Sequence, residues 1–335
     1  WSSDVCSSDL NGLKVVGKDL KKCKLVVSGA GAAALACLDL IVDLGFPIEN
    51  IFVTDLAGVV YKGRKELMDP DKERFAQDIS ARTLAEVIPG ADIFLGLSAG
   101  GVLKPDMVRA MAERPLVLAL ANPTPEILPE EVREVRNDAV IATGRSDYPN
   151  QVNNVLCFPY IFRGALDCGA TTITRSMEIA TVHAIAELAQ AEQSDVVATT
   201  YGVTNLAFGA DYIIPKPFDP RLMLKIAPAV ALAAEKSGVA QRPIKDIAAY
   251  TDKLQQFVYH SGSLMKPVFA MAKKAPAAKK RIVFAEGEEE RVLRAVQVVI
   301  DEGLAKPILI GRPAVLAQRI ERYGLRLRPE IDFDV

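Results

Sequence analysis

The stretch that most constrains the fold is KLVVSGAGAAALACLDLIVDLGFPIENIFVTD, which spans residues 24–55. An apolar run ends at a turn that contains Gly29 and Gly31, an alanine-rich segment follows, and a second apolar run ends at Asp55. Gly29 allows a tight turn out of a strand. Gly31 lets a diphosphate approach the backbone at the amino end of a helix, where free N–H groups favour an anion. Ala34 completes the G-x-G-x-x-A spacing and lets the helix pack closely on the strand. The stretch therefore predicts a dinucleotide-binding unit; the alternative is an alanine-rich helix after an ordinary turn.

Asp55 ends the second apolar run, 24 residues after Gly31 (55 − 31), close to the spacing at which such units carry the acid that hydrogen-bonds the ribose. A carboxylate there accepts from a ribose 2′-OH and repels a 2′-phosphate, which argues for NAD. Lys62 and Arg64 follow and could neutralise such a phosphate, or they are solvated loop charges, so the residues leave NAD and NADP open. The cofactor-binding residues predicted from this unit are Gly29, Ala30, Gly31, Ala32, Ala33, Ala34 and Asp55.

Short β-branched runs alternate with helical patterns through the first 143 residues. Strands are predicted at residues 24–28, 51–55, 93–97, 116–120 and 139–143. Helices are predicted at residues 31–45, 81–88, 104–112 and 129–135. Strands that alternate with helices indicate βαβ units, and nearly continuous apolar strands indicate a sheet covered on both faces. The predicted fold is α/β, with a doubly wound, Rossmann-like parallel sheet.

Three asparagines follow predicted strands. Asn122 comes directly after one strand, and Asn153 and Asn154 lie in the polar loop after the next. In doubly wound sheets ligands lie at the carboxyl ends of the strands, and an amide can both donate and accept a hydrogen bond there. Asn122 is therefore a candidate for cofactor and substrate. The alternatives are an Asn-Pro turn for Asn122 and a helix N-cap for Asn153 or Asn154.

Composition excludes several classes of protein. The formal net charge is -2 and aromatic residues make up 6%, so neither a basic field nor a base-stacking surface indicates nucleic acid. No apolar run is long enough to span a membrane. The five cysteines form no C-x-x-C pair and indicate free buried thiols in a reducing, cytoplasmic compartment. Only two histidines are present, His183 and His260, so a histidine-based metal site or a Ser-His-Asp triad is not expected.

The two ends of the chain differ from its middle. The first ten residues, WSSDVCSSDL, carry neither periodicity nor a secretory signal pattern. They look like translated adapter sequence, so residues 1–10 are expected to be a non-native leader, and the native sequence is expected to enter at Asn11. Residues 11–262 form the predicted dinucleotide-binding domain, and residues 263–280, rich in Ala, Lys and Pro, form a predicted linker. Residues 281–335 begin a second α/β unit, which is expected to be too short to bury its own core.

Several motifs together resemble one family. The segments VVSGAGAAALACLDL, VTDLAGVVYKGR, ADIFLGLSAGGVL, LALANPTPEI and ATGRSDYPNQVNNVLCFPYIFRGALDCGATTI are similar to the NAD(P)-binding domain of bacterial malic enzymes. The segment RIVFAEGEEERVLRAVQVVIDEGLAKPILIGRP resembles the start of a phosphotransacetylase-like domain. This order is that of the hybrid NADP-dependent malic enzymes, in which the two modules are fused.

The resemblance implies a reaction and its participants. The family oxidatively decarboxylates (S)-malate to pyruvate and CO2, with oxaloacetate-decarboxylating activity, using NADP, with NAD as the alternative, and Mg2+ or Mn2+. Carried over to this sequence, Gly29–Ala33 would bind the cofactor phosphates, Asn122 and Asn153 would contact the cofactor, and Asn122 and Asn154 would contact the substrate. The resemblance also implies a cytoplasmic homo-oligomer with acetyl-CoA as an allosteric ligand of the full-length protein.

The family's catalytic tyrosine, catalytic lysine and acidic metal ligands all precede the position that matches Asn11. No catalytic residue and no metal ligand is therefore assigned in this chain. A cofactor-binding fragment without turnover is the alternative function. Two further readings, a phosphotransacetylase and another amino- or hydroxy-acid dehydrogenase, lack an identifiable catalytic residue.

Overall fold

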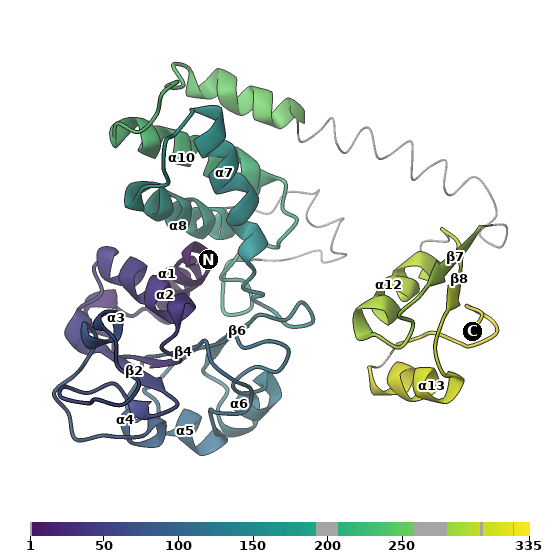
Figure 1. Ribbon diagram of the computed structural model, residues 1–335, viewed down its shortest axis with the longest axis horizontal. Helices are drawn as coiled ribbons and strands as arrows, with labels where there is room; N and C mark the ends of the chain where they lie inside the picture. Colours follow the sequence, from purple (N-terminus) through teal and green to yellow (C-terminus); the bar gives the residue numbers. More distant parts are fainter. Residues whose placement is uncertain (1, 192–206, 258–279, 302–303, 324) are drawn as a thin grey trace. The chain divides into compact units, whose positions relative to one another are not determined.

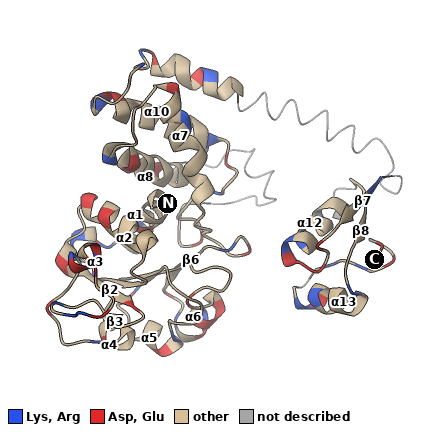
Figure 2. Cartoon of the chain, in the orientation of Figure 1, with Lys and Arg blue, Asp and Glu red and all other residues tan. Residues whose placement is uncertain are grey.

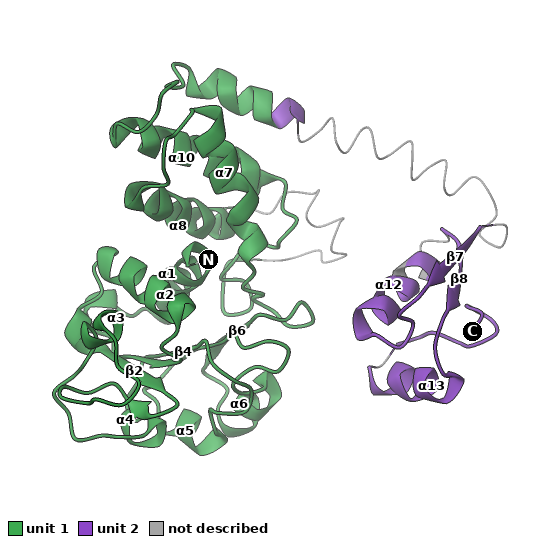
Figure 3. Cartoon of the chain, in the orientation of Figure 1, with its two compact units in different colours: residues 1–254 green, residues 255–335 purple. Residues whose placement is uncertain are grey.

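The computed structural model describes residues 2–191, 207–257, 280–301, 304–323 and 325–335. It forms two compact units, unit 1 from Trp1 to Leu254 and unit 2 from Gln255 to Val335 (Figure 3). Nearly all of the predicted linker at 263–280 lies outside the described residues. The domain boundaries drawn from the sequence stay predictions.

Unit 1 is built on a six-stranded sheet (Figure 1) with the order β3-β2-β1-β4-β5-β6. The strands are β1 Leu25–Ser28, β2 Ile51–Asp55, β3 Gly58–Val59, β4 Ile93–Gly96, β5 Leu116–Ala119 and β6 Val140–Thr143. All neighbours pair in parallel except β3, which runs antiparallel to β2. The doubly wound fold is confirmed, and β3 is the one strand that the sequence did not predict. The chain reverses its direction of winding at β1, between β2 and β4, which is where ligands bind in such sheets.

Helices cover both faces of this sheet. The helices of unit 1 are α1 Ser3–Val16, α2 Ala32–Asp43, α3 Pro70–Glu73, α4 Leu84–Val87, α5 Pro105–Arg109, α6 Pro129–Val135, α7 Phe158–Asp167, α8 Arg175–Gln190 and α10 Arg221–Lys236. Leu25 and Val27 point into a core shared with α1, α2 and α8, whereas Val26 points into a second core shared with α4, α5 and α6. Side chains alternate between the faces of a strand, so a strand covered on both faces is apolar throughout.

Short turns of 3-10 helix join several of these elements, and one more helix follows α10. The 3-10 helices are η1 Leu20–Lys22, η2 Ile48–Asn50 and η3 Asn154–Leu156. A helix also covers residues 247–257. None of the helices in the described ranges is long and apolar enough to cross a membrane. All five cysteines are buried and free, as predicted.

Helix α1 runs without a break across the predicted junction between residue 10 and Asn11. It packs against α2 and α8, and most of residues 3–9 are buried in that contact. Asp4 and Asp9 are each 1% exposed, and no carboxylate oxygen of either has a hydrogen-bond partner among the described residues. Two carboxyl groups thus occupy positions that suit apolar side chains. That residues 1–10 are non-native stays a prediction.

Unit 2 contains β7 Arg281–Phe284, α12 Glu290–Asp301, β8 Lys306–Leu309 and α13 Pro313–Arg322. The two strands pair in parallel. The expectation that this segment cannot bury a core was wrong, because Leu293, Leu309 and Phe333 are each 0% exposed within one apolar cluster. Glu288, which precedes α12, accepts hydrogen bonds from Arg312 at 2.8 and 2.9 Å.

Candidate functional site

The glycine-rich turn joins β1 to α2, and the structure requires a glycine at only one of its two glycine positions. Gly29 has a φ of +113°, and a Cβ on it would lie 2.4 Å from the backbone oxygen of Leu97. Its N–H donates to the carbonyl of Thr54 at 2.8 Å, which ties the turn to β2. Gly31 is the N-cap of α2 with a φ of -84°, and an added Cβ would meet nothing within 4 Å. The fold itself therefore requires Gly29 but leaves open space at Gly31.

The first turn of α2 offers unpaired backbone donors to an anion. No side chain caps this helix, and its first turn holds no acidic residue. Ala32 and Ala33 are exposed, whereas Ala34 is 1% exposed and packs into the core, as the spacing predicted. Because the first N–H groups of a helix lack partners within the helix, this turn can accept a phosphate.

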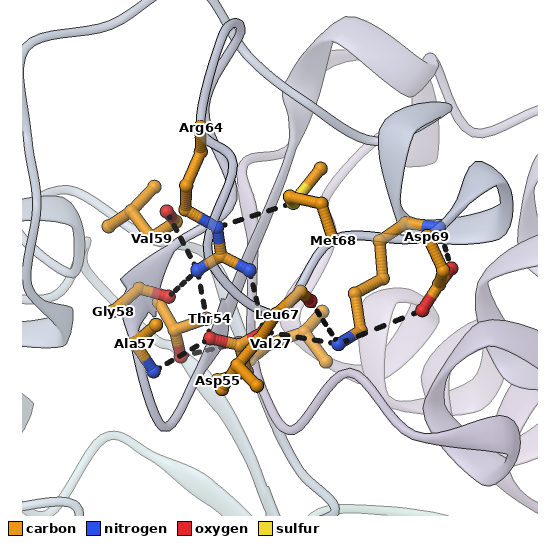
Figure 4. A network of polar contacts seen from close by, with 11 residues as sticks. Val27, Thr54, Asp55, Ala57, Gly58, Val59, Arg64, Leu67, Met68 and Asp69 are labelled. Carbon is orange, nitrogen blue, oxygen red and sulfur yellow. Dashed lines mark hydrogen bonds and ion pairs between the residues drawn. The ribbon is translucent and has the colours of Figure 1, made fainter.

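Asp55 does not stand free at the end of β2 (Figure 4). Its Oδ1 accepts from Arg64 Nη1 at 2.8 Å and from the Ala57 amide at 2.9 Å. Its Oδ2 accepts from Arg64 Nη2 at 2.6 Å and from Lys72 Nζ at 3.4 Å. Burial raises the pKa of Asp55, but the hydrogen bonds from Arg64 and Ala57 outweigh it, so its pKa lies below the ordinary value. Asp55 is thus an ionised, four-fold hydrogen-bonded carboxylate, and its predicted contact with the cofactor stays a prediction.

The predicted asparagines converge on one cavity of about 270 Å³. Its lining residues are Asp4, Val5, Ala33, Cys37, Leu97, Leu120, Asn122, Gly144, Val152, Asn153 and Asn154. Ala33 belongs to the glycine-rich turn and its helix, so the cavity adjoins the predicted phosphate site. A Cβ on Gly144 would lie 2.7 Å from Asn122 Nδ2, so a larger residue at position 144 would displace the Asn122 side chain.

Asn153 has a structural role as well. Its Oδ1 accepts from the Val155 amide at 3.1 Å, so it caps η3, which was the alternative given to it from the sequence. Its amide nitrogen and the second lone pair of Oδ1 are left to face a ligand. Asn154, the first residue of η3, is exposed. The cofactor and substrate roles of these asparagines stay predictions.

Asp4 lines the same cavity and was not predicted. Burial raises its pKa to about 6. It is the one carboxylate in the lining, and the described residues contain no group of three His, Cys, Asp or Glu side chains that could hold a metal ion. The residues described here therefore do not fit a divalent metal.

Glu126 is a second residue that the sequence did not reveal. Its side chain is 0% exposed, and it accepts from the Ser98 amide at 2.8 Å and from the Ala121 amide at 3.0 Å. The Ser98 hydroxyl in turn lies 2.8 Å from that of Ser28. One carboxylate thus holds together the carboxyl ends of β1, β4 and β5, on which the cavity is built. A lone acid in a loop has no periodicity, so nothing in the sequence pointed to it.

Replacing Glu126 with alanine is expected to lower the free energy of unfolding of unit 1 by about 3 kcal/mol, because the buried Ala121 amide and the part-buried Ser98 amide both lose a charged acceptor. Urea denaturation followed by circular dichroism measures this loss. Glu134→Ala, an exposed position on the neighbouring α6, is the matched control and should change stability by less than about 0.5 kcal/mol. Equal effects of the two substitutions would contradict the role assigned to Glu126.

Comparison with known proteins gives consistent matches. The family described as "Malic enzyme, NAD binding domain" matches residues 5–203, and "Phosphate acetyl/butaryl transferase" matches residues 263–333. A "NAD-dependent malic enzyme" of Rhizobium meliloti is 62% identical over 331 residues, 99% of this chain and 43% of that protein. A "NADP-dependent malic enzyme" of Salmonella typhimurium is 61% identical, over 97% of this chain and 43% of that protein. The chain thus spans less than half the length of these relatives.

Among solved structures, the "Crystal structure of Entamoeba histolytica Malic Enzyme" is similar with a TM-score of 0.67 and 34% identity. The match covers 80% of this chain and 54% of that one. The likeness therefore extends from the sequence to the three-dimensional arrangement of most of the chain.

Proposed function

This chain belongs to the malic enzyme family, whose NAD-binding domain it contains, and from that premise we propose that it is the cofactor-binding part of an enzyme that oxidatively decarboxylates malate to pyruvate. The glycine-rich turn and the amino end of α2 would hold the diphosphate of the cofactor. The cavity lined by Asn122, Asn153 and Asn154 would hold the nicotinamide and the substrate. When bound, the cofactor supplies a hydride acceptor.

The observation that carries this proposal is the position of the cavity. It lies at the carboxyl edge of the sheet, adjoins α2 through Ala33, and is lined by amides that can donate to a carboxylate and accept from a hydroxyl. A small dicarboxylic acid with one hydroxyl group matches those donors and acceptors.

NADP is the proposed cofactor, with NAD as the alternative. Relatives of nearly equal identity carry both names, since the Rhizobium protein is NAD-dependent and the Salmonella protein NADP-dependent. The proposal extends to a cytoplasmic homo-oligomer that responds to acetyl-CoA. The match of residues 263–333 to "Phosphate acetyl/butaryl transferase" supports the acetyl-CoA part alone.

A second candidate function is cofactor binding without turnover by this chain. The residues that line the cavity include neither a lysine nor a tyrosine, and among the described residues no metal cluster is present. The lining thus contains none of the basic or phenolic side chains that commonly serve as general bases and acids in oxidative decarboxylation.

Titration calorimetry with NADP+ and NAD+ tests the binding proposal, and NADPH absorbance in the presence of malate and Mn2+ tests turnover. We expect saturable dinucleotide binding and no malate-dependent NADPH production by this chain. Turnover by a clean preparation would refute the second candidate. The absence of any dinucleotide binding by the folded chain would refute both.

A further inference from the structure

Glu126 is a buried acid at the edge of the sheet where the nicotinamide is proposed to lie, and this inference rests on that proposed function. Its carboxyl group packs against Gly96, the last residue of β4, where an added Cβ would lie 2.4 Å from Glu126 Cδ. A side chain at position 96 would therefore displace the carboxyl group. The end of β4 thus leaves room for an acid that comes from the loop after β5.

The carboxylate lies directly behind the wall of the cavity. Its Oε1 accepts from the Ser98 amide at 2.8 Å and from the Ser98 hydroxyl at 3.2 Å, and its Oε2 accepts from the Ala121 amide at 3.0 Å. The residues next to these two amides in the chain, Leu97 and Asn122, both line the cavity. Glu126 itself is 0% exposed, so it lies one residue behind the lining and does not touch what the cavity holds.

The charge of Glu126 is held by neutral groups. Both of its oxygens accept from a backbone N–H, which is the pattern of an ionised carboxyl group, since protonation would place a hydrogen on one of these acceptor oxygens. In the described part of the chain its donors are two amides and one hydroxyl, and none of them carries a positive charge. The strands β1, β4, β5 and β6 contain no charged residue (Figure 2). The negative charge therefore acts in apolar surroundings, where electrostatic interactions are stronger than in water.

The two oxidation states of the cofactor differ in charge at one place. The oxidised nicotinamide ring carries one positive charge and the reduced ring carries none, whereas the diphosphate is the same in both. A fixed negative charge behind the ring therefore favours the oxidised form, and its repulsion of the diphosphate cancels when the two forms are compared. Two opposite unit charges about 10 Å apart attract strongly enough to change a binding constant roughly tenfold at an effective dielectric constant of about 20.

We propose that Glu126 makes the cavity selective for the oxidised dinucleotide, because it places a buried negative charge behind the ring that carries the positive charge. The selectivity favours loading of the form that accepts a hydride and release of the form that has received one. Asp4, the one carboxylate in the lining itself, would act in the same direction when it is ionised. The contribution of Glu126 is therefore measured in a chain that carries Asp4→Asn.

The test compares Glu126→Gln with the unchanged Glu126 in this Asp4→Asn chain, so that the two proteins differ by one buried charge. Calorimetry measures the affinities for NADP+, NADPH and 2′-phospho-ADP-ribose, which lacks the nicotinamide. We expect the affinity for NADP+ relative to that for NADPH to fall roughly tenfold. The affinities for NADPH and 2′-phospho-ADP-ribose should change together, because neither ligand carries the nicotinamide charge. The pair NAD+ and NADH serves equally if the chain prefers NAD.

A purely structural role of Glu126 gives a different result. If Glu126→Gln leaves the ratio of the NADP+ and NADPH affinities unchanged or raises it, whatever happens to the separate affinities, the proposal is overturned. Glu134→Gln, which removes an exposed carboxylate on α6, is the matched control and should not move this ratio.

A second measurement applies if Glu126→Gln does not fold, as circular dichroism would show. The Asp4→Asn chain should then bind NADP+ more tightly than NADPH, and equal or tighter binding of NADPH would overturn the proposal. Failure of the folded, unsubstituted chain to bind any of the three ligands would instead refute the proposed function.

Discussion

Gly31→Thr is expected to abolish dinucleotide binding while leaving the fold intact. Gly31 adopts an extended conformation that threonine shares, and no protein atom lies within 4 Å of the added Cβ. Threonine is also about as good an N-cap as glycine, so α2 should not lose stability. A branched side chain would, however, fill the space through which a diphosphate reaches the backbone. We expect the affinity for NADP+ to fall by at least about 100-fold, or about 2.8 kcal/mol.

The control for this prediction is the neighbouring glycine. Gly29→Ala places a methyl group 2.4 Å from the Leu97 carbonyl at a φ of +113°, so it should lower the melting temperature of unit 1. Calorimetric titration and thermal melts of both variants separate the two effects. Unchanged NADP+ affinity in Gly31→Thr would place the diphosphate elsewhere and remove the basis of the proposed function.

Asp9→Leu is expected to stabilise unit 1 by about 4 kcal/mol at pH 7. Asp9 is 1% exposed and has no hydrogen-bond partner among the described residues. Burial raises its pKa from 3.8 to about 8. At pH 7 the folded state must therefore bind a proton that the unfolded state does not bind, and leucine removes that cost.

The sign of the pH dependence follows from the direction of the shift. Between pH 3.8 and about 8 the folded state binds more protons at Asp9 than the unfolded state does, so this residue lowers stability as pH rises. As the pH falls toward 3.8 the unfolded state also binds this proton, so the gain from leucine should shrink to about 1 kcal/mol near pH 4.5.

Urea denaturation at pH 4.5 and pH 7 measures this difference, with Asp9→Asn as the matched control. Asparagine has nearly the shape of aspartate but does not titrate. In the Asp9→Asn variant, residue 9 should therefore no longer make the stability of unit 1 depend on pH. An equal gain from leucine at both pH values would show that Asp9 does not titrate as a buried carboxyl.

The sequence was sufficient for elements with a strong pattern. The five parallel strands were recognised because both of their faces are apolar, and the turn out of β1 because Gly29 and Ala34 each have a steric reason in the fold. The hairpin strand β3 was missed because two residues have no periodicity. That omission had a further consequence, since β3 is what brings Arg64 back onto Asp55. From the sequence, Arg64 could neutralise a cofactor phosphate, whereas in the structure it pairs with the carboxylate of Asp55.

Some residues of the candidate site could likewise be predicted from the sequence, and others could not. Asn122, Asn153 and Asn154 were predicted to meet because strand ends share one edge of a sheet, and they do line one cavity. Asp4 could not be predicted there, because its position depends on how α1 packs against distant helices. The cap formed by Asn153 was foreseen only as an alternative, because an asparagine before a helix serves equally well in either role.

The carboxylate of Glu126 couples loops that are otherwise independent in sequence. Here the turns after β1, β4 and β5 are all held by the carboxylate of Glu126. Altering the length of any one of these turns should therefore displace the other two. Redesign of these three turns should therefore vary them jointly and keep Glu126. In libraries that vary one turn alone, most members should misfold.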